Sequence, residues 1–256
     1  MAKKQERKNR RVLILVLTIV LIIVVGVSIF SLYLLGYIGP KQTQLFNAAY
    51  MGNWGRFGML IYDYNDFGAV DRYGQTLFHL ACYQANDDIV KRMISQGASV
   101  NTREKSRIGG TPLYCAAQTG HVKVAQILLD NVAQVNAKDN YGWTPLHKAV
   151  SKQLEEMVRL LLKNGADVNI TSTGGWTPLH QALKSPYRTK PEIVELLIQY
   201  GADVNQSNPS GKSWDSQHDS HPFRRTTAYM GDTPLEIAIN KGYDDIVDLL
   251  QKHGAK

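Results

Sequence analysis

The chain has 256 residues, of which 44% are hydrophobic and 20% are charged, so it can bury a core and is not compositionally disordered. Its formal net charge of +7 is concentrated at the N-terminus, where six Lys and Arg stand against one Glu in residues 1–11. The other 245 residues carry a net charge of only about +2, which argues against broad electrostatic binding of a polyanion such as nucleic acid.

An apolar segment follows this basic tail. Residues 12–40 read VLILVLTIVLIIVVGVSIFSLYLLGYIGP and contain no charged side chain over 29 positions. A bilayer core needs about 20 apolar residues in a helix, so we expect an uncleaved transmembrane helix over 12–38. Two alternatives remain open: a cleaved signal peptide, whose apolar stretch is shorter and ends at a small-residue cleavage site, and a buried core helix, which would have a polar face.

The charge distribution predicts the orientation of this span. Positive segments stay in the cytoplasm, so we expect residues 1–11 inside and the body of the chain on the non-cytoplasmic side. Tyr33 and Tyr37 lie where an aromatic belt at the far interface is expected. The non-cytoplasmic side is the periplasm in a Gram-negative bacterium and the lumen or cell surface in a eukaryote.

The rest of the chain is repetitive. The hexapeptide GWTPLH occurs at 142–147 and again at 175–180, 33 residues apart. A second landmark, GADVN or a close variant, begins 21 residues after most of the aligned threonines. Alignment on the threonine of TPLH gives Thr43, Thr76, Thr111, Thr144, Thr177 and Thr233, with spacings of 33, 35, 33, 33 and 56.

Each unit predicts a pair of short helices. In the fourth unit, Thr144 can cap a first helix whose first residue is Pro145, where the missing N–H costs nothing. A second helix over 154–164 places its apolar residues on one stripe, and Gly165 ends it in a left-handed conformation. One such pair cannot bury its own apolar face, so neighbouring units must stack.

This pattern resembles the ankyrin repeat in period, in the TPLH motif and in the closing GADVN, and the resemblance covers Thr43 to Lys256. It implies an all-α solenoid of about six units over 41–256, with β-hairpin fingers, beyond the one N-terminal transmembrane helix. The resemblance also implies that His79, His147 and His180 bridge finger and helix backbone. Val132 stands where the pattern has glycine, so we expect a locally altered helix end there.

Ankyrin repeats bind proteins through their fingertips and first helices, which implies candidate contacts at the positions that vary between units. Because aromatic residues dominate interface energetics, we expect the aromatics among them to be exposed and to contact a partner. In the alternative reading, Trp143 and Trp176 pack against each other along the stack. The candidates in the repeats are Tyr73, Tyr83, Tyr141, Trp143, Lys152 and Trp176.

A long insertion interrupts the last unit. Thr233 follows Asn205 by 28 positions, where ordinary units have 8, so about 20 residues are inserted within 206–229. Its polar composition predicts either a specificity loop or a floppy insertion. Its candidate anchors are Trp214, Phe223, Arg224 and Arg225.

Other chemistry finds little support in the residue pattern. The tripeptide GKS at 211–213 lacks the strand, first glycine and helix of a phosphate-binding loop, and the pair His218 and His221 lacks a fixed second shell for a metal. Cys82 and Cys115 can form a disulfide in an oxidising compartment or act as small buried residues. We therefore expect no catalytic residue, no cofactor, no metal, no nucleic-acid partner and no small-molecule substrate.

Together these features predict a membrane-anchored protein that binds a partner protein on the non-cytoplasmic side, as a scaffold or accessory protein. An alternative is an immunity protein that neutralises a toxic effector enzyme in the periplasm. The arrangement resembles single-span membrane-anchored ankyrin proteins of Gram-negative bacteria, which implies a bacterial inner membrane.

Overall fold

The computed structural model describes residues 40–185, 187, 189–208 and 232–256. The segment expected to span a membrane (12–38) lies outside these residues, as does most of the insertion, from 209 to 231. Within the described part of the chain, no helix has the length and apolar character needed to cross a bilayer.

The described residues form twelve α-helices, two for each repeat unit, as the sequence pattern predicts. They are α2 (Lys41–Tyr50), α3 (Trp54–Leu60), α4 (Leu77–Tyr83), α5 (Asp87–Ser95), α6 (Pro112–Thr119), α7 (Val122–Asp130), α8 (Pro145–Ser151), α9 (Glu155–Lys163), α10 (Pro178–Lys184), α11 (Pro191–Gln199), α12 (Pro234–Lys241) and α13 (Asp244–Lys252).

The helices fall into two compact units, one ending at Tyr64 and one beginning at Asn65. In the first, α2 packs on α3 and buries Leu45 and Phe57. Unlike Thr144, the aligned Thr43 does not cap its helix, because α2 already begins at Lys41, after Pro40.

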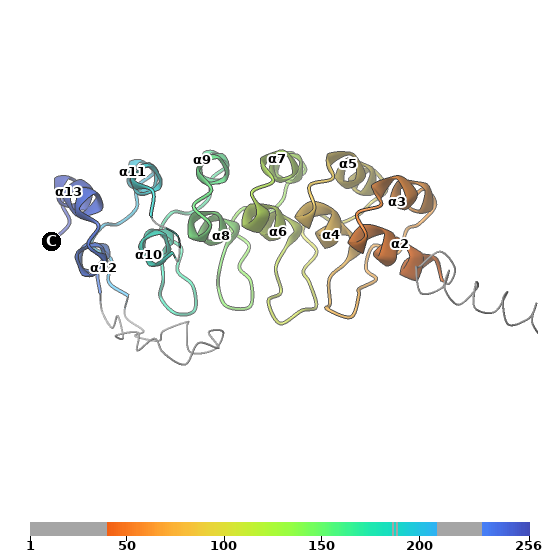
Figure 1. The fold of residues 1–256 in the computed structure, drawn as a ribbon, viewed down its shortest axis with the longest axis horizontal. Coiled ribbons are helices and arrows are strands. Elements are labelled where there is room, and N and C mark those ends of the chain that lie inside the picture. The colour runs from red at the N-terminus through yellow and green to blue at the C-terminus, as the bar shows by residue number, and fades with distance from the viewer. Residues whose placement is uncertain (1–39, 186, 188, 209–231) are drawn as a thin grey trace, which may run out of the picture. The chain divides into compact units, whose positions relative to one another are not determined.

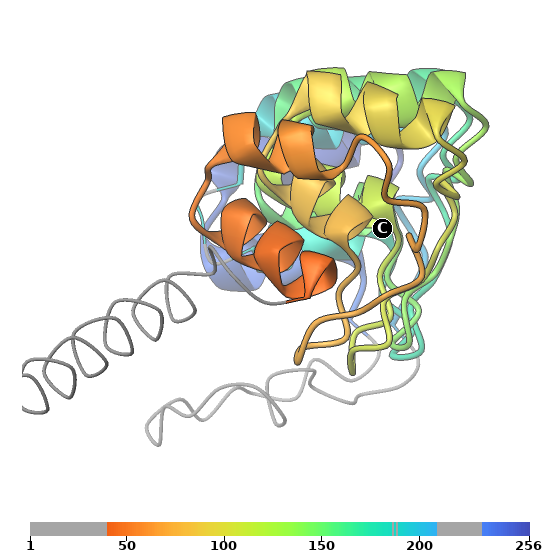
Figure 2. The same cartoon turned by 90° about the vertical axis from the view of Figure 1, so that its right-hand side faces the viewer.

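In the second unit, the helices form two rows. α4, α6, α8, α10 and α12 contact one another in sequence as the inner row, and α5, α7, α9, α11 and α13 do so as the outer row (Figure 1). Seen along the stack, the inner row lies between the outer row and the ends of the loops that connect successive helix pairs (Figure 2). We call these loops fingers. The core lies between the rows and between neighbouring pairs, where leucines such as Leu146 and Leu161 are fully buried.

The inner helices begin at the repeated threonines for a local reason. In all five helices of the inner row, the threonine side-chain oxygen accepts a hydrogen bond from the backbone N–H three residues later. This bond satisfies one of the free N–H groups of the first turn. Four of the five helices also have proline in the first position, where its missing N–H is not needed.

Each of the five outer helices is followed by a residue with a left-handed backbone conformation, and in four of the five this residue is glycine. The exception is Val132, which adopts φ 64° like its glycine counterparts. The backbone at this helix end is therefore not altered. The chain keeps the geometry of the other units, and Val132 adopts a conformation that is strained for a β-branched residue.

The fingers are turns rather than the β-hairpins that the resemblance implies. Among the described residues, the only strand-like pairing is an isolated bridge between Val70 and Thr76. The finger of the fourth unit closes instead with single bonds, such as that from Asp139 N to Trp143 O at 2.8 Å. Fingers also join in series, as in the 3.0 Å bond from Thr173 N to Tyr141 O, so each finger is positioned by the one before it.

Candidate protein-binding surface

The repeated histidines are structural. In the fourth unit, Thr144 N donates to His147 Nδ1 at 3.2 Å, and His147 Nε2 lies 2.9 Å from the carbonyl oxygen of Trp176 in the next finger. Since a carbonyl can only accept, Nε2 carries the proton. Nδ1 accepts from Thr144 N and therefore carries none, so the ring is neutral. His79 bridges in the same way to Thr102 O, at 3.1 Å. The bridging role that the resemblance implies is confirmed for these two rings.

Burial also keeps the rings neutral. It lowers the pKa of His147 to about 3 and that of His180 to about 4. For His147, a second proton would go on Nδ1, where it would oppose the N–H of Thr144. At neutral pH these rings are therefore uncharged, and both nitrogens of His147 are occupied by hydrogen bonds of the framework.

The asparagine that closes each repeat joins neighbouring units. Asn169 donates through Nδ2 to Gly201 O and accepts from Asp203 N, both at 2.8 Å. Asn205 makes the same pair of bonds, at 3.1 Å to Gly254 O and 2.9 Å from Lys256 N. Asn101 makes the same two bonds with Val132 O and Gln134 N, and Asn136 makes them with Gly165 O and Asp167 N. Asn169 and Asn205 each begin an Asn-X-Ser/Thr sequence of the kind that can be glycosylated, but their side-chain amides are occupied by these structural bonds.

An aspartate organises the fourth finger. Asp139 is buried; its Oδ1 accepts from Tyr141 N and Trp143 N, both at 2.8 Å, and its Oδ2 accepts from the hydroxyl of Tyr114 at 2.8 Å. This network fixes the finger to α6 of the preceding unit. Burial, followed by the neighbouring carboxylate, raises the pKa of Tyr114 far above its ordinary value, so the phenol remains protonated and can donate.

The two indoles expected at the partner surface are buried. Trp143 and Trp176 are only 5% and 2% exposed, so the expectation that they are exposed contacts is wrong. Each ring instead packs edge-on against the histidine four residues later, with centroids 4.9 Å apart for His147 and 5.8 Å for His180. An indole in this position fills the space between finger and helix, which periodicity alone does not reveal.

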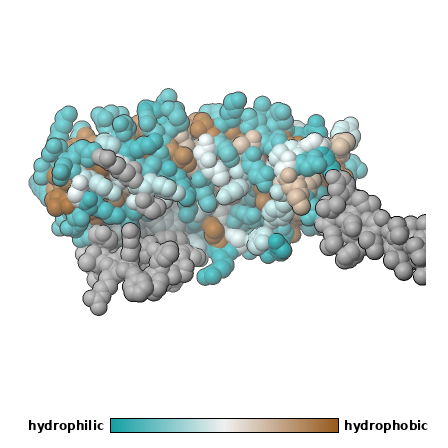
Figure 3. Space-filling view, in the orientation of Figure 1, coloured by the Kyte–Doolittle hydropathy of each residue, from teal (hydrophilic) through white to brown (hydrophobic). Residues whose placement is uncertain are grey.

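The other candidates of the repeats do reach the surface. Tyr73 at a fingertip and Tyr83 at the end of α4 are 55% and 44% exposed, Lys152 after α8 is exposed, and Tyr141 is half-buried. The Arg72 guanidinium lies over the Tyr73 ring, 4.8 Å from its centroid. The coloured part of the face seen in Figure 3 is mostly hydrophilic, with scattered apolar residues and no broad apolar patch.

The fifth unit has a short insertion of three residues after α10, since Gly201 follows Thr177 by 24 positions where most units have 21, and this segment is hydrogen-bonded to the fourth unit. Ser185 Oγ donates to Ser151 O at 2.9 Å, and Lys190 N donates to Gln153 Oε1 at 2.8 Å. These bonds place the exposed Tyr187 near Lys152, whose ammonium lies 5.6 Å from the centroid of that ring. Tyr187 was not among the sequence candidates, because a residue inside an insertion has no repeat position to mark it.

The two cysteines do not form a disulfide. Cys82 and Cys115 are both free and buried, so the disulfide alternative is not formed. Burial raises the pKa of both thiols well above the ordinary value, as expected of small core residues. In the described part of the chain, no group of three His, Cys, Asp or Glu side chains could hold a metal ion.

Comparison with known families agrees with this architecture. A model of three ankyrin repeats matches residues 45–139, 78–172 and 134–208, and a single ankyrin repeat matches 230–256. The chain belongs to the ankyrin-repeat family. Ankyrin repeats imply protein–protein interaction, and scaffolds of this family are generally non-enzymatic.

Several curated ankyrin proteins are similar to parts of the chain. The ankyrin repeat and KH domain-containing protein mask of Drosophila melanogaster is 40% identical over 62 residues, 24% of this chain and 2% of that protein. The putative E3 ubiquitin-protein ligase XBAT35 of Arabidopsis thaliana is 32% identical over 100 residues, 39% of this chain and 22% of the ligase. A putative ankyrin repeat protein of Rickettsia felis is 33% identical over 98 residues, 38% of this chain and 32% of that protein. The matched region thus spans less than a third of each relative.

The described candidates of the repeats fall into two groups, buried framework residues and surface residues. Trp143 and Trp176 belong to the structural framework of the repeats, whereas Tyr73, Tyr83 and Lys152 lie on the surface formed by fingertips and inner helices. The four candidates of the long insertion are outside the described residues: Trp214, Phe223, Arg224 and Arg225.

Proposed function

We propose that this ankyrin protein recognises a partner protein through its inner helices and fingertips, as a scaffold or accessory protein anchored in a membrane. The observation that carries this proposal is the contrast between repeat positions. Residues common to the units are buried and bonded, whereas the varying positions Tyr73, Tyr83 and Lys152 are exposed and make up one surface. Exposed tyrosines supply large contact area at low entropic cost, which suits protein recognition.

The membrane part of the proposal rests on the sequence. The uncharged stretch of 29 residues after six basic side chains favours an anchor with the N-terminus in the cytoplasm. In a bacterial inner membrane, the repeats would then act in the periplasm. α2 begins at Lys41, directly after the apolar stretch, so the partner would be met close to the bilayer.

The surface is tested by affinity capture with the full-length protein in a non-ionic detergent, followed by quantitative mass spectrometry. We expect a stoichiometric partner whose capture falls about tenfold or more in Tyr83→Ala/Lys152→Ala, because truncating central contacts costs at least 1–2 kcal/mol. The matched control is Tyr200→Ala, which removes an exposed tyrosine at the end of the outer helix α11 and should leave capture unchanged.

Three results would have different meanings. Equal capture by wild type and by Tyr83→Ala/Lys152→Ala would place recognition elsewhere and overturn the surface assignment. A captured enzyme that stays active in the complex supports the scaffold role. A captured enzyme whose activity is abolished one-to-one would replace it with the inhibitor, or immunity, role.

A further inference from the structure

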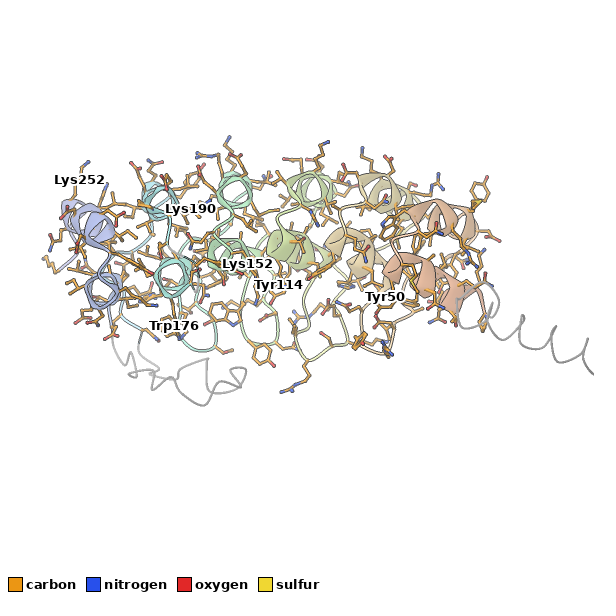
Figure 4. All side chains as sticks on the ribbon, in the orientation of Figure 1. Tyr50, Tyr114, Lys152, Trp176, Lys190 and Lys252 are labelled. Carbon is orange, nitrogen blue, oxygen red and sulfur yellow. The ribbon has the colours of Figure 1, made fainter. Side chains whose placement is uncertain are left out.

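The ends of three successive fingers carry a surplus of exposed cations. Residues 70–76, 102–110 and 137–143 hold five Lys or Arg side chains and three carboxylates. Figure 4 shows side chains projecting from the ends of the fingers, away from both rows of helices. The five cations are all exposed, and they are Arg72, Arg103, Lys105, Arg107 and Lys138.

The three carboxylates of these fingers are hydrogen-bonded within the protein. Glu104 is 8% exposed; one of its oxygens accepts from Gln75 Nε2 of the preceding finger at 3.0 Å, and the other accepts from a serine of its own finger at 2.7 Å. The buried Asp139 accepts from two finger N–H groups and from the hydroxyl of Tyr114, which is labelled on α6 in Figure 4. The half-buried Asp71 accepts from two N–H groups of its own finger, at 2.8 and 2.9 Å. The exposed charge at the finger ends is therefore positive.

The three fingers are joined to one another. Lys105 N donates to Gly74 O at 2.7 Å, which connects the first finger to the second. Asn140 N donates to Ile108 O at 2.8 Å, which connects the second finger to the third. The approach at Gly74 is so close that a Cβ there would lie 2.5 Å from the carbonyl carbon of Lys105. The cations therefore stand on one continuous surface rather than on independent loops.

Two of the five cations brace this surface. Arg103 donates to Lys138 O at 2.6 Å and to Asn140 Oδ1 at 3.0 Å, both in the following finger. Lys138 Nζ donates to Thr171 O at 2.8 Å, in the finger after that. Their charges add to the positive potential, but part of their donor capacity is used within the protein.

The other three cations are available to a partner. They are exposed, and none of them takes part in an ion pair within the described part of the chain. The Arg72 guanidinium lies over the ring of Tyr73, a contact that orients the charge without neutralising it. We call Arg72, Lys105 and Arg107 the cationic ridge.

The charge of the outer helices has the opposite sign. The helices α5, α7, α9, α11 and α13 contain ten acidic and six basic side chains, a net charge of −4. An acidic chain that approaches the molecule is therefore attracted by the finger ends and repelled by the outer row.

The spacing of the fingers suits an extended polypeptide. The fingers follow one another along the stack (Figure 1), and packed helices lie about 10 Å apart. An extended chain advances about 3.3 Å per residue, so acidic side chains about three residues apart match successive fingers. Tyr73 and Ile108, 55% and 41% exposed, offer apolar contact beside the cations. Outside the basic tail the chain has a net charge of only about +2, which disfavours a long polyanion such as nucleic acid.

We propose that the cationic ridge is the docking site for an acidic, extended segment of the partner protein, whose carboxylates pair with Arg72, Lys105 and Arg107. This inference rests on the proposed function and adds the chemistry of the partner to it. The guanidinium groups can hold a carboxylate through two parallel hydrogen bonds. Charge complementarity of this kind sets specificity and association rate more than raw affinity.

The test uses a phage-displayed library of random dodecapeptides, selected on the full-length protein in a non-ionic detergent. We expect the enriched peptides to carry more Asp and Glu than the unselected library. A labelled enriched peptide should bind about tenfold or more weakly to R72Q/K105Q/R107Q, since three exposed charge pairs are lost together. In R72K/K105R/R107K, which keeps all three charges, binding should fall by about threefold at most.

The matched control is K91Q/K123Q/K163Q, which removes the same number of exposed charges from the outer helices α5, α7 and α9. Equal weakening in both glutamine variants would show a general charge effect and overturn the proposal. Enriched peptides without an acidic excess, or acidic peptides that bind R72Q/K105Q/R107Q as tightly as wild type, would overturn it as well. So would a library from which nothing is enriched.

Failure of the ridge is distinguishable from failure of the proposed function. A partner whose capture falls in Tyr83→Ala/Lys152→Ala but not in R72Q/K105Q/R107Q would overturn the ridge and spare the proposed function. Capture that is unchanged in both variants would contradict both.

Competition identifies other anions. The labelled peptide is challenged with a 20-nucleotide single-stranded DNA and with water-soluble dihexanoyl-phosphatidylglycerol. The proposal expects an unlabelled acidic peptide to displace the label and both other probes to fail at comparable charge concentration. Displacement by the DNA or the lipid at that concentration would overturn the proposal and reassign the ridge to a nucleic acid or a membrane surface.

Discussion

Val132 takes a left-handed backbone conformation that glycine adopts at the same repeat position elsewhere. Its φ is 64°, beside 94° at Gly97, 82° at Gly165, 87° at Gly201 and 86° at Gly254. For a β-branched residue this conformation costs about 1–2 kcal/mol. The side chain is 82% exposed, so it gains little packing in return.

We therefore expect Val132→Gly to stabilise the protein by about 0.5–1 kcal/mol. The relief of strain exceeds the extra conformational entropy that glycine gives the unfolded chain, which is about 0.5–1 kcal/mol. Urea unfolding, followed by the fluorescence of the buried Trp143 and Trp176, measures the free energy of unfolding. Val132→Ala is the control and should gain less, because alanine keeps a Cβ; a destabilised glycine variant would contradict the strain argument.

The buried histidines make a second prediction at the residue scale. In the folded protein the pKa values are about 3 for His147 and about 4 for His180, below the ordinary 6.5 of the unfolded chain. The unfolded state therefore takes up protons first, so the stability these rings contribute is present above pH 6.5 and is lost as pH falls toward the folded pKa values. Lowering the pH from 7.5 to 5.5 should therefore reduce the free energy of unfolding by about 1.4 kcal/mol for each of these rings.

Urea titrations at pH 7.5, 6.5 and 5.5 measure this loss. His147→Gln removes one of the buried titrating rings and should reduce the loss of unfolding free energy between pH 7.5 and 5.5 by about 1.4 kcal/mol, whatever its effect at pH 7.5. A free energy of unfolding that does not change between pH 7.5 and 5.5 would rule out the buried neutral rings.

At the scale of the elements, the closing asparagine of each unit is the joint to the next. Asn169 makes two bonds with residues of the following repeat, and Asn205 does the same across the long insertion. A large insertion is thus tolerated because the polar joint and the helix contacts bypass it. The repeat positions of these residues were visible in the sequence, but their partners lie 32 to 51 positions away.

We expect Asn169→Ala to destabilise the protein by about 2 kcal/mol, because two hydrogen bonds contribute about 1 kcal/mol each. Asn164→Ala is the matched control: its amide bonds only to Leu160 O in its own helix, at 2.9 Å, and its loss should cost less than about 1 kcal/mol. Both are measured by urea unfolding. Equal costs would show that the joint between units adds nothing beyond a local bond.

At the scale of the whole chain, the proposed membrane topology predicts on which side of the membrane the repeats lie. A phosphatase that folds only in an oxidising compartment, fused after Lys256 in a Gram-negative host, should be active, because the basic tail holds the N-terminus in the cytoplasm. Replacing the six Lys and Arg of residues 1–11 by Gln and adding basic residues after Pro40 should lower that activity sharply. An inactive fusion with the native tail would contradict the non-cytoplasmic placement of the repeats.

The sequence by itself determined the repeat, the helix pairs and their caps, because these depend on neighbours within one unit: Thr144 with Pro145, the apolar stripe of α9, and the glycine at 165. The bridging histidines followed from the family resemblance. Only the tertiary structure decided which aromatics are exposed. Tyr73 and Tyr141 occupy the same finger position, three residues before Thr76 and Thr144, yet Tyr73 is 55% exposed and Tyr141 is half-buried, because burial depends on the unit stacked alongside. The same holds for the contacts of the Lys148 ammonium with the Tyr114 ring and of the Lys152 ammonium with the Tyr187 ring, which join residues of different repeat units that no periodicity places together.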